Sequence, residues 1–212
     1  LPVREFPDDL FVFFATRNGI VKKTPLSDYS RPRANGIWAI DLPEEDELVN
    51  VSLTDGKQDI MLFSSSGKCI RFAEGDVRSM GRVARGVIGI RLKKGQNVVS
   101  MLVMDDGDVL TVTENGYGKR TPAEEHHCQG RGGQGVIGIK TSKRNGALIA
   151  AIQVTSEDDI MLISDGGTLV RTHADEISTL GRNTQGVTLI RLREDENLVG
   201  LARIQGDDAD AG

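Results

Sequence analysis

The sequence predicts an all-β fold built from four repeated units. The chain has 212 residues, of which 25 are glycine and only 4% are aromatic, and stretches with apolar residues at helical spacing are scarce. In addition, an apolar run followed by a turn glycine recurs at intervals of 48, 49 and 51 residues, at Gly19, Gly67, Gly116 and Gly167. A fixed period of this length indicates a repeat architecture.

Each unit begins with a predicted β-hairpin. In the first unit the apolar residues 11–15 precede Asn18-Gly19, and Asn-Gly supplies the positive φ that a tight hairpin turn requires. The equivalent predicted turns are Ser66-Gly67, Asn115-Gly116 and Gly166-Gly167.

A second glycine opens another apolar segment in every unit. These glycines are Gly36, Gly86, Gly135 and Gly186, and the segments are residues 37–40, 87–90, 136–139 and 187–190, where Trp38 is predicted to lie in the core. A third segment follows at residues 48–53, 98–103, 148–154 and 198–204. Four short strands in about 50 residues match a propeller blade. We expect repeats at 10–54, 59–104, 108–155 and 159–205, and residues 1–3 align with the tails of later units, as a remnant of an upstream one.

The charge alternates with the repeat. The net charge is -5, but residues 19–36, 67–94, 116–144 and 167–193 carry +3, +6, +4 and +2, whereas the segments between them are acidic. A basic surface within an acidic chain is compatible with a polyanionic partner.

The basic residues are also in register. The fourth residue after the turn glycine is Lys23, Arg71, Arg120 or Arg171. The fourth residue before the second glycine is Arg82, Arg131 or Arg182 in the last three units, and Arg33 is shifted by one in the first. The fifth residue after the second glycine is Arg91, Lys140 or Arg191. Equivalent positions of a repeat lie on equivalent surfaces, so these side chains are predicted to bind a curved polyanion. The alternative is that each pairs with a neighbouring acid as an ordinary surface residue. The candidate DNA-binding residues are Lys22, Lys23, Arg31, Arg33, Lys68, Arg71, Arg82, Arg85, Arg91, Lys119, Arg120, Arg131, Lys140, Arg171, Arg182 and Arg191.

No catalytic or metal site is predicted, and no cofactor. Residues 116–121 lack the Ser or Thr after Lys that a phosphate-binding loop needs, and the adjacent His126, His127 and Cys128 cannot all turn to one ion. Cys69 and Cys128 are isolated, which favours a reducing, cytoplasmic compartment. Apolar runs are far shorter than the roughly 18 residues of a membrane span, so no membrane partner is expected.

The units resemble the C-terminal domain repeats of bacterial DNA gyrase A and, more distantly, those of the topoisomerase IV C subunit. The resemblance covers nearly the whole chain and rests on stretches such as Asn18-Gly-Ile-Val-Lys-Lys-Thr24 and Asn115-Gly-Tyr-Gly-Lys-Arg-Thr121. It implies a β-pinwheel, a disc of four-stranded blades that exchange strands, whose rim wraps duplex DNA for negative supercoiling. It also implies a parent that is an ATP-dependent type IIA topoisomerase, with the rest of gyrase A and with gyrase B as partners, and a bacterial, nucleoid-associated location.

The family's box, Gln-Arg-Arg-Gly-Gly-Arg/Lys-Gly, has a degenerate match in the third unit. It consists of Gln129, Gly130, Arg131, Gly132, Gly133, Gln134 and Gly135, with Gly130 and Gln134 at positions where the box is basic. The resemblance further implies that residues 206–212 begin an acidic tail, and we expect the chain itself to be monomeric and non-catalytic. The competing interpretation is a protein-binding propeller module, which would not need cations in register.

Overall fold

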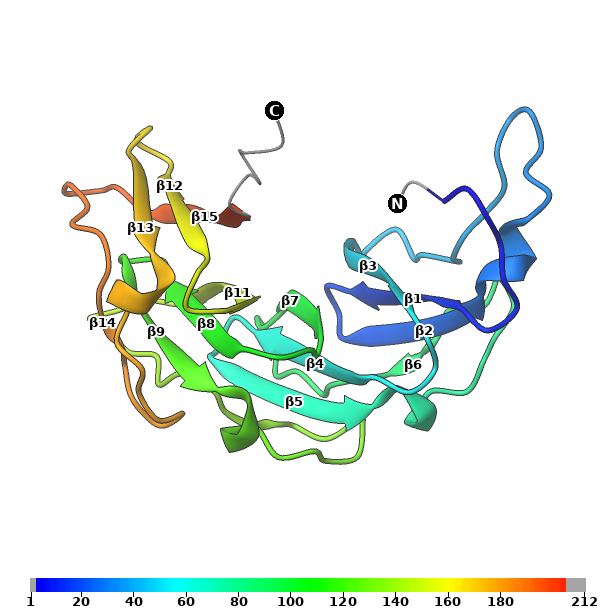
Figure 1. The fold of residues 1–212 in the computed structure, drawn as a ribbon, viewed down its shortest axis with the longest axis horizontal. Helices are drawn as coiled ribbons and strands as arrows, with labels where there is room; N and C mark the ends of the chain where they lie inside the picture. The colour runs from blue at the N-terminus through cyan, green and yellow to red at the C-terminus, as the bar shows by residue number, and fades with distance from the viewer. Residues whose placement is uncertain (1–2, 205–212) are drawn as a thin grey trace, which may run out of the picture. The chain divides into compact units, whose positions relative to one another are not determined.

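The computed structural model describes residues 3–204, and Figure 1 shows its fold. Within these residues the secondary structure consists of 15 strands and four short 3-10 helices, η1 to η4. No helix in this part of the chain is long and apolar enough to cross a membrane. The all-β prediction is confirmed, whereas Leu1, Pro2 and the predicted tail at 206–212 lie outside the described residues.

The same order of elements recurs four times. The first repeat contains β1 (Phe11–Thr16), β2 (Ile20–Pro25), η1 (Leu26–Tyr29) and β3 (Leu48–Thr54). The second contains β4 (Asp59–Ser64), β5 (Lys68–Ala73), η2 (Glu74–Asp76), β6 (Val87–Ile88) and β7 (Val98–Val103). The third contains β8 (Asp108–Thr113), β9 (Tyr117–Pro122), η3 (Ala123–Glu125), β10 (Val136–Ile137) and β11 (Leu148–Val154). The fourth contains β12 (Asp159–Ser164), β13 (Leu169–His173), η4 (Ala174–Glu176), β14 (Val187–Thr188) and β15 (Leu198–Ile204).

The four predicted hairpin turns are present. Their glycines have φ values of +80° to +85°, which side chains other than glycine rarely adopt. Three of them, Gly19, Gly67 and Gly116, also make room for the next repeat, since a Cβ at Gly67, for example, would lie 2.2 Å from the carbonyl oxygen of Ile139. In these three repeats the turn glycine therefore meets two requirements, one within its hairpin and one toward the following repeat.

Strands are exchanged between consecutive repeats. The sheet orders are β3-β1-β2-β6, β10-β5-β4-β7, β11-β8-β9-β14 and β13-β12-β15. In the first three sheets the strand beside the second hairpin strand comes from the following repeat, as where β6 pairs with β2 and β14 with β9. Among the described residues the fourth sheet has three strands, and no exchanged strand pairs with β13.

The chain forms two compact units, each with its own apolar core. Among the described residues, the first comprises 3–62, 70–104 and 128–135, and the second 63–69, 105–127 and 136–204. In the first unit Phe13, Ile60 and Phe72 are fully buried in the main cluster, and in the second Leu110, Val154 and Ile160 are. These residues come from the central strands and their neighbours, as the apolar runs predict.

The core position predicted for Trp38 is wrong, because its side chain is 77% exposed. In the later repeats the equivalent segment includes a two-residue strand, β6, β10 or β14, that pairs with the preceding hairpin. Residues 37–40 form no strand in the described part of the chain and pair with no preceding hairpin there. The equivalent residues of the later repeats, Ile88, Ile137 and Thr188, are exposed as well, although a preceding hairpin pairs with their strands, so this position of the repeat faces outward.

Candidate nucleic-acid interface

Four loops carry most of the exposed predicted cations. We call residues 30–41, 81–91, 130–140 and 181–191 the crossover loops, since in the later repeats they contain the exchanged strand. Each exchanged segment is anchored on the turn glycine of the preceding repeat. Gly89 and Ile90 donate their backbone N–H groups to the carbonyl oxygen of Gly19 at 2.8 and 3.2 Å, and Leu189 and Ile190 do the same to Gly116.

Successive crossover loops are joined by arginine side chains in register. The Nη1 group of Arg131 donates to the carbonyl oxygen of Ile88 at 3.2 Å. The equivalent bonds run from Arg82 to Trp38 at 3.4 Å and from Arg182 to Ile137 at 3.0 Å. A backbone carbonyl accepts one of the five N–H groups of a guanidinium and leaves its positive charge uncompensated.

The sixteen predicted residues fall into three groups by exposure. Eight are exposed, namely Arg31, Arg33, Arg85, Arg91, Arg131, Lys140, Arg171 and Arg191. Five are half-buried, namely Lys68, Arg71, Arg82, Arg120 and Arg182. Lys22, Lys23 and Lys119 are buried. Seven of the eight exposed cations lie on the crossover loops, and the exception, Arg171, lies on β13.

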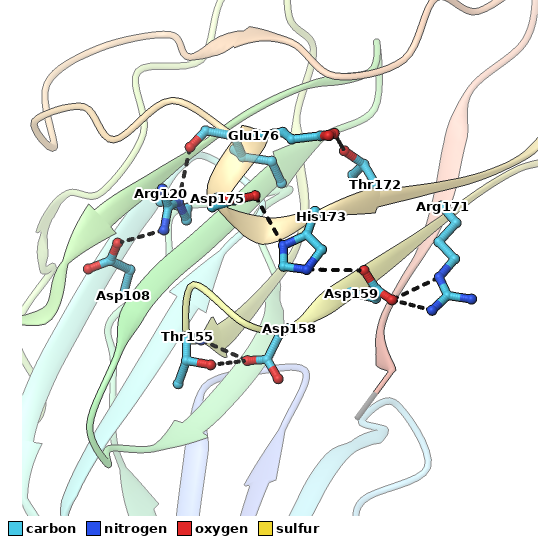
Figure 2. A network of polar contacts seen from close by, with 11 residues as sticks. Asp108, Arg120, Thr155, Asp158, Asp159, Arg171, Thr172, His173, Asp175 and Glu176 are labelled. Atoms are coloured by element: carbon cyan, nitrogen blue, oxygen red, sulfur yellow. Dashed lines mark hydrogen bonds and ion pairs between the residues drawn. The ribbon is translucent and has the colours of Figure 1, made fainter. Parts of the chain in front are cut away.

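In the last three repeats the cation at the fourth position after the turn glycine, Arg71, Arg120 or Arg171, is paired with an acid. Figure 2 shows Arg120 beside Asp108, at 3.5 Å, and Arg171 bonded to Asp159. Arg71 donates to Asp59 at 2.8 Å in the same way.

In the first repeat an aromatic ring takes the place of the acid. The ammonium group of Lys23 lies 5.0 Å from the centre of the Phe11 ring and donates to the carbonyl oxygen of Glu74 at 3.1 Å. The cation at the fourth position after the turn glycine thus has a partner within the protein in all four repeats.

The two other buried lysines are also engaged inside the protein. The ammonium group of Lys119 donates to the carbonyl oxygens of Gly181 and Arg182, and that of Lys22 donates to Ala39 and Arg82. Burial lowers the pKa of each lysine to about 8. Neither group presents its charge at the surface.

The degenerate box runs beside the second crossover loop. Gly132 donates its N–H group to Gly89 at 2.6 Å, and the Nε group of Arg91 donates to the carbonyl oxygen of Gly132 at 2.8 Å. Gly132 and Gly135 have φ values of +79° and +70°, so both positions favour glycine. The glycines at these two positions thus allow the backbone conformation in which the Gly132 carbonyl accepts from Arg91.

Exposed cations that the sequence prediction missed follow the crossover loops directly. Lys93 and Lys94 come shortly after Arg91, and Arg193 comes two residues after Arg191. Lys93 and Arg193 are both the seventh residue after the second glycine of their repeats, which is the signal that could have found them. Arg144 is also exposed and stacks at 5.1 Å over the ring of Tyr117.

The side chains of His126, His127 and Cys128 lie in different environments. His126 is buried, 3.7 Å from the Sγ atom of Cys69, whereas His127 and Cys128 are exposed. Burial raises the pKa of the Cys69 thiol to about 12, so this thiol is protonated at neutral pH. Among the described residues, no group of three or more His, Cys, Asp or Glu side chains could hold a metal ion.

Comparison with known proteins agrees with this geometry. A family model described as DNA gyrase C-terminal domain, beta-propeller, matches residues 11–55, 58–103, 107–155 and 158–205. DNA gyrase A of Pseudomonas aeruginosa is 58% identical over 209 residues, and that of Escherichia coli is 54% identical over 205 residues. Both matches cover 96% of this chain and 23% of the relative, so the chain spans about a quarter of the length of these relatives.

Solved structures share the fold. A structure of the DNA gyrase A C-terminal domain superposes with a TM-score of 0.84 at 27% identity, over 96% of this chain and 68% of that one. The C-terminal domain of DNA topoisomerase IV superposes with a TM-score of 0.90 at 26% identity, over 97% of this chain and 65% of that one. Since the family model matches all four repeats, the chain belongs to the family of DNA gyrase C-terminal domains.

Proposed function

We propose that the crossover loops bind duplex DNA without sequence preference, and that the chain bends or wraps this DNA in support of negative supercoiling by DNA gyrase. The observation that carries the proposal is the contrast between the two sets of cations. Apart from the half-buried Lys68, those on the hairpin strands are paired with acids or buried. Those on the crossover loops are exposed except for the half-buried Arg82 and Arg182 and, apart from Arg85 beside Asp41, form no ion pair within the described residues.

Exposed guanidinium and ammonium groups are suited to phosphates. Each phosphate contact releases condensed counterions, which supplies affinity without reading base sequence. No helix longer than four residues is available within residues 3–204 to enter a major groove, so sequence reading of that kind has no support. Repeated phosphate contacts are the mode of binding that this surface favours.

Acidic residues flank the crossover loops in the sequence. Glu44, Glu45 and Glu47 follow the first loop, and Glu194 and Asp195 follow the fourth, and all five are exposed. Like-charge repulsion at these positions would keep DNA on the basic loops. This distribution explains how a chain of net charge -5 can bind a polyanion.

The names of the relatives support the wider assignment. They are DNA gyrase A proteins and come from bacteria, so we propose that this chain acts within gyrase, together with the rest of gyrase A and with gyrase B, on DNA in the bacterial cytoplasm. In this proposal the chain contributes DNA binding and bending, and the chemistry of strand passage belongs to other parts of the enzyme.

The experiment is a salt titration of binding to a linear duplex, measured by fluorescence anisotropy. The test variant is R91Q/K140Q/R191Q, which changes one equivalent position in three crossover loops. The control variant is R4Q/K57Q/R203Q, which removes the same charge at exposed positions outside these loops and away from the cations that follow them in sequence. If each loop cation neutralises one phosphate, the slope of log K against log salt falls by about 2.7 in the test variant.

The control variant is expected to keep nearly the wild-type slope. Equal losses in the two variants would show that total charge, and not the crossover loops, determines binding. Wild-type binding that does not change with salt would favour the protein-binding alternative and contradict the proposal.

A further inference from the structure

We infer that Lys22 and Lys119 are positioning residues for DNA binding, because each buried ammonium group fixes the crossover loop of the following repeat. This inference rests on the proposed function of those loops. Both lysines are the third residue after a turn glycine and are fully buried. The equivalent residues of the second and fourth repeats are Ile70 and Val170, so the lysine is a feature of alternate repeats.

Lys119 uses all three of its N–H groups on one loop. Its Nζ atom donates to the carbonyl oxygens of Gly181 and Arg182 at 2.5 and 2.7 Å, and to the hydroxyl of Thr184 at 3.1 Å. The Thr184 hydroxyl in turn donates to the carbonyl of Gly181 at 2.8 Å. An ammonium group has three donors, and here each has an acceptor on residues 181–184.

Lys22 makes the equivalent contacts in the first repeat. It donates to the carbonyl oxygens of Arg82 and, at 2.6 Å, of Ala39, so it ties two crossover loops together. Tyr29 donates to the same Ala39 oxygen at 3.0 Å, and the Lys22 ammonium group lies 5.1 Å from the centre of the Phe14 ring. The lysine therefore links the hairpin to two successive loops.

The clamped residue is the one that joins neighbouring loops. Arg182 is held at its backbone by Lys119, while its guanidinium reaches Ile137. Arg82 is held at its backbone by Lys22, while its guanidinium reaches Trp38. Each arginine is thus fixed at its backbone and at its guanidinium, which limits the conformations that the rest of its loop can adopt.

The repeats without this lysine show when it is needed. The loop after the second repeat is the glycine-rich box, and Gly132 and Arg91 hold it through their own bonds. A Cβ at Gly133 would lie 3.5 Å from the Ile70 side chain, so this loop packs directly on an apolar residue. Because an apolar side chain fits this position, burying an ammonium group in it is costly and points to a role beyond filling space.

The test compares Lys119→Met with Ile70→Met, which is an apolar change at the equivalent buried position of the second repeat. Hydrogen–deuterium exchange is followed across residues 181–186, and duplex affinity is measured over a salt series. In Lys119→Met we expect exchange in this segment to accelerate by about tenfold or more, since hydrogen bonds to a charged group are lost. We also expect the salt slope to fall by about 0.9, as for one lost phosphate contact.

A double-mutant cycle separates positioning from general destabilisation. If Lys119 acts through Arg182, then K119M/R182Q loses no more affinity than R182Q alone. Additive losses would overturn the inference, and so would unchanged exchange together with unchanged affinity.

Thr184→Val keeps the buried lysine and removes one of its acceptors, together with the bond from the Thr184 hydroxyl to the Gly181 carbonyl. It should change the exchange rate and the duplex affinity in the same direction as Lys119→Met does, but by a smaller amount. If neither quantity changes, the inference is also contradicted. If the wild-type protein binds no duplex, the proposed function fails, while the exchange measurement still decides whether the lysine fixes the loop.

Discussion

Replacing a turn glycine by alanine should lower the free energy of unfolding far more where the next repeat lies close to the glycine than where no other part of the protein does. Gly116 and Gly167 have φ values of +81° and +82° and lie in the same compact unit. A Cβ at Gly116 would lie 2.5 Å from the carbonyl oxygen of Ile190, whereas a Cβ at Gly167 would have no described atom outside its immediate neighbours within 4 Å. Comparing the two glycines therefore separates the energetic cost of the backbone conformation from that of the close contact with the next repeat.

The two costs can be worked out from these contacts. Alanine in the left-handed region costs about 1–2 kcal/mol at either glycine. At Gly116 the backbone of Ile190 must also move away, which weakens the two bonds that Leu189 and Ile190 donate to the Gly116 carbonyl at 2.8 and 3.2 Å. With about 1 kcal/mol for each bond, Gly116→Ala should destabilise the protein by about 3–4 kcal/mol and Gly167→Ala by about 1–2 kcal/mol.

Urea unfolding of the two variants, followed by far-UV circular dichroism, measures the difference. Exchange of the amides of Leu189 and Ile190 should also accelerate in Gly116→Ala and stay unchanged in Gly167→Ala. Equal destabilisation of the two variants would refute the claim that the approach of the crossover strand restricts this position to glycine.

Two further predictions concern charged side chains. Because burial lowers the pKa of Lys22 and Lys119 from 10.5 to about 8, the unfolded chain binds more protons between these values, so stability should rise with pH from about 8 to 10.5. The urea midpoint should therefore rise more between pH 7.5 and pH 9.5 in the wild type than in K22M/K119M. Equal shifts in the two proteins would contradict a stabilising loss of buried charge. The raised pKa of Cys69 has the opposite effect on stability, but this effect is common to both proteins. Asp159→Asn removes the acid beside the exposed Arg171, so duplex binding should tighten several-fold and the salt slope should steepen. This gain should vanish in the background of Arg171→Gln, and a gain that persists there would exclude Arg171 as its cause.

The repeat and its hairpins could be predicted from the sequence because they depend on local chemistry. Asn18-Gly19 and the apolar runs around it specify a turn and two strands without reference to distant residues. The exposure of Trp38 could not be predicted in the same way. A large apolar residue in an apolar segment indicates burial, but this position of the repeat faces outward, and the equivalent Ile88 and Ile137 are exposed as well.

The roles of the registered cations were predictable only in part. Asp59, Asp108 and Asp159 stand eight residues before their turn glycines, in register with the arginines that they bind, and the first repeat has Phe11 at this position. A search for acids in register would have indicated the pairs. The burial of Lys22 and Lys119 has no such signal, because a lysine beside an exposed arginine and a lysine clamped on carbonyls look alike in sequence.

In the proposed function, strand exchange and DNA binding both depend on the crossover loops. A crossover loop is held by the turn glycine of the preceding repeat, by an arginine that reaches the neighbouring loop and, in two cases, by a buried lysine. Bending a duplex of 20–30 base pairs costs on the order of 1–6 kcal/mol, which phosphate contacts must offset. A cation on a loosely held loop would lose about 0.5–1.5 kcal/mol of that contribution in ordering its side chain on binding. Loops fixed by the fold lose less, so the contacts that join one repeat to the next also favour the binding of a bent duplex.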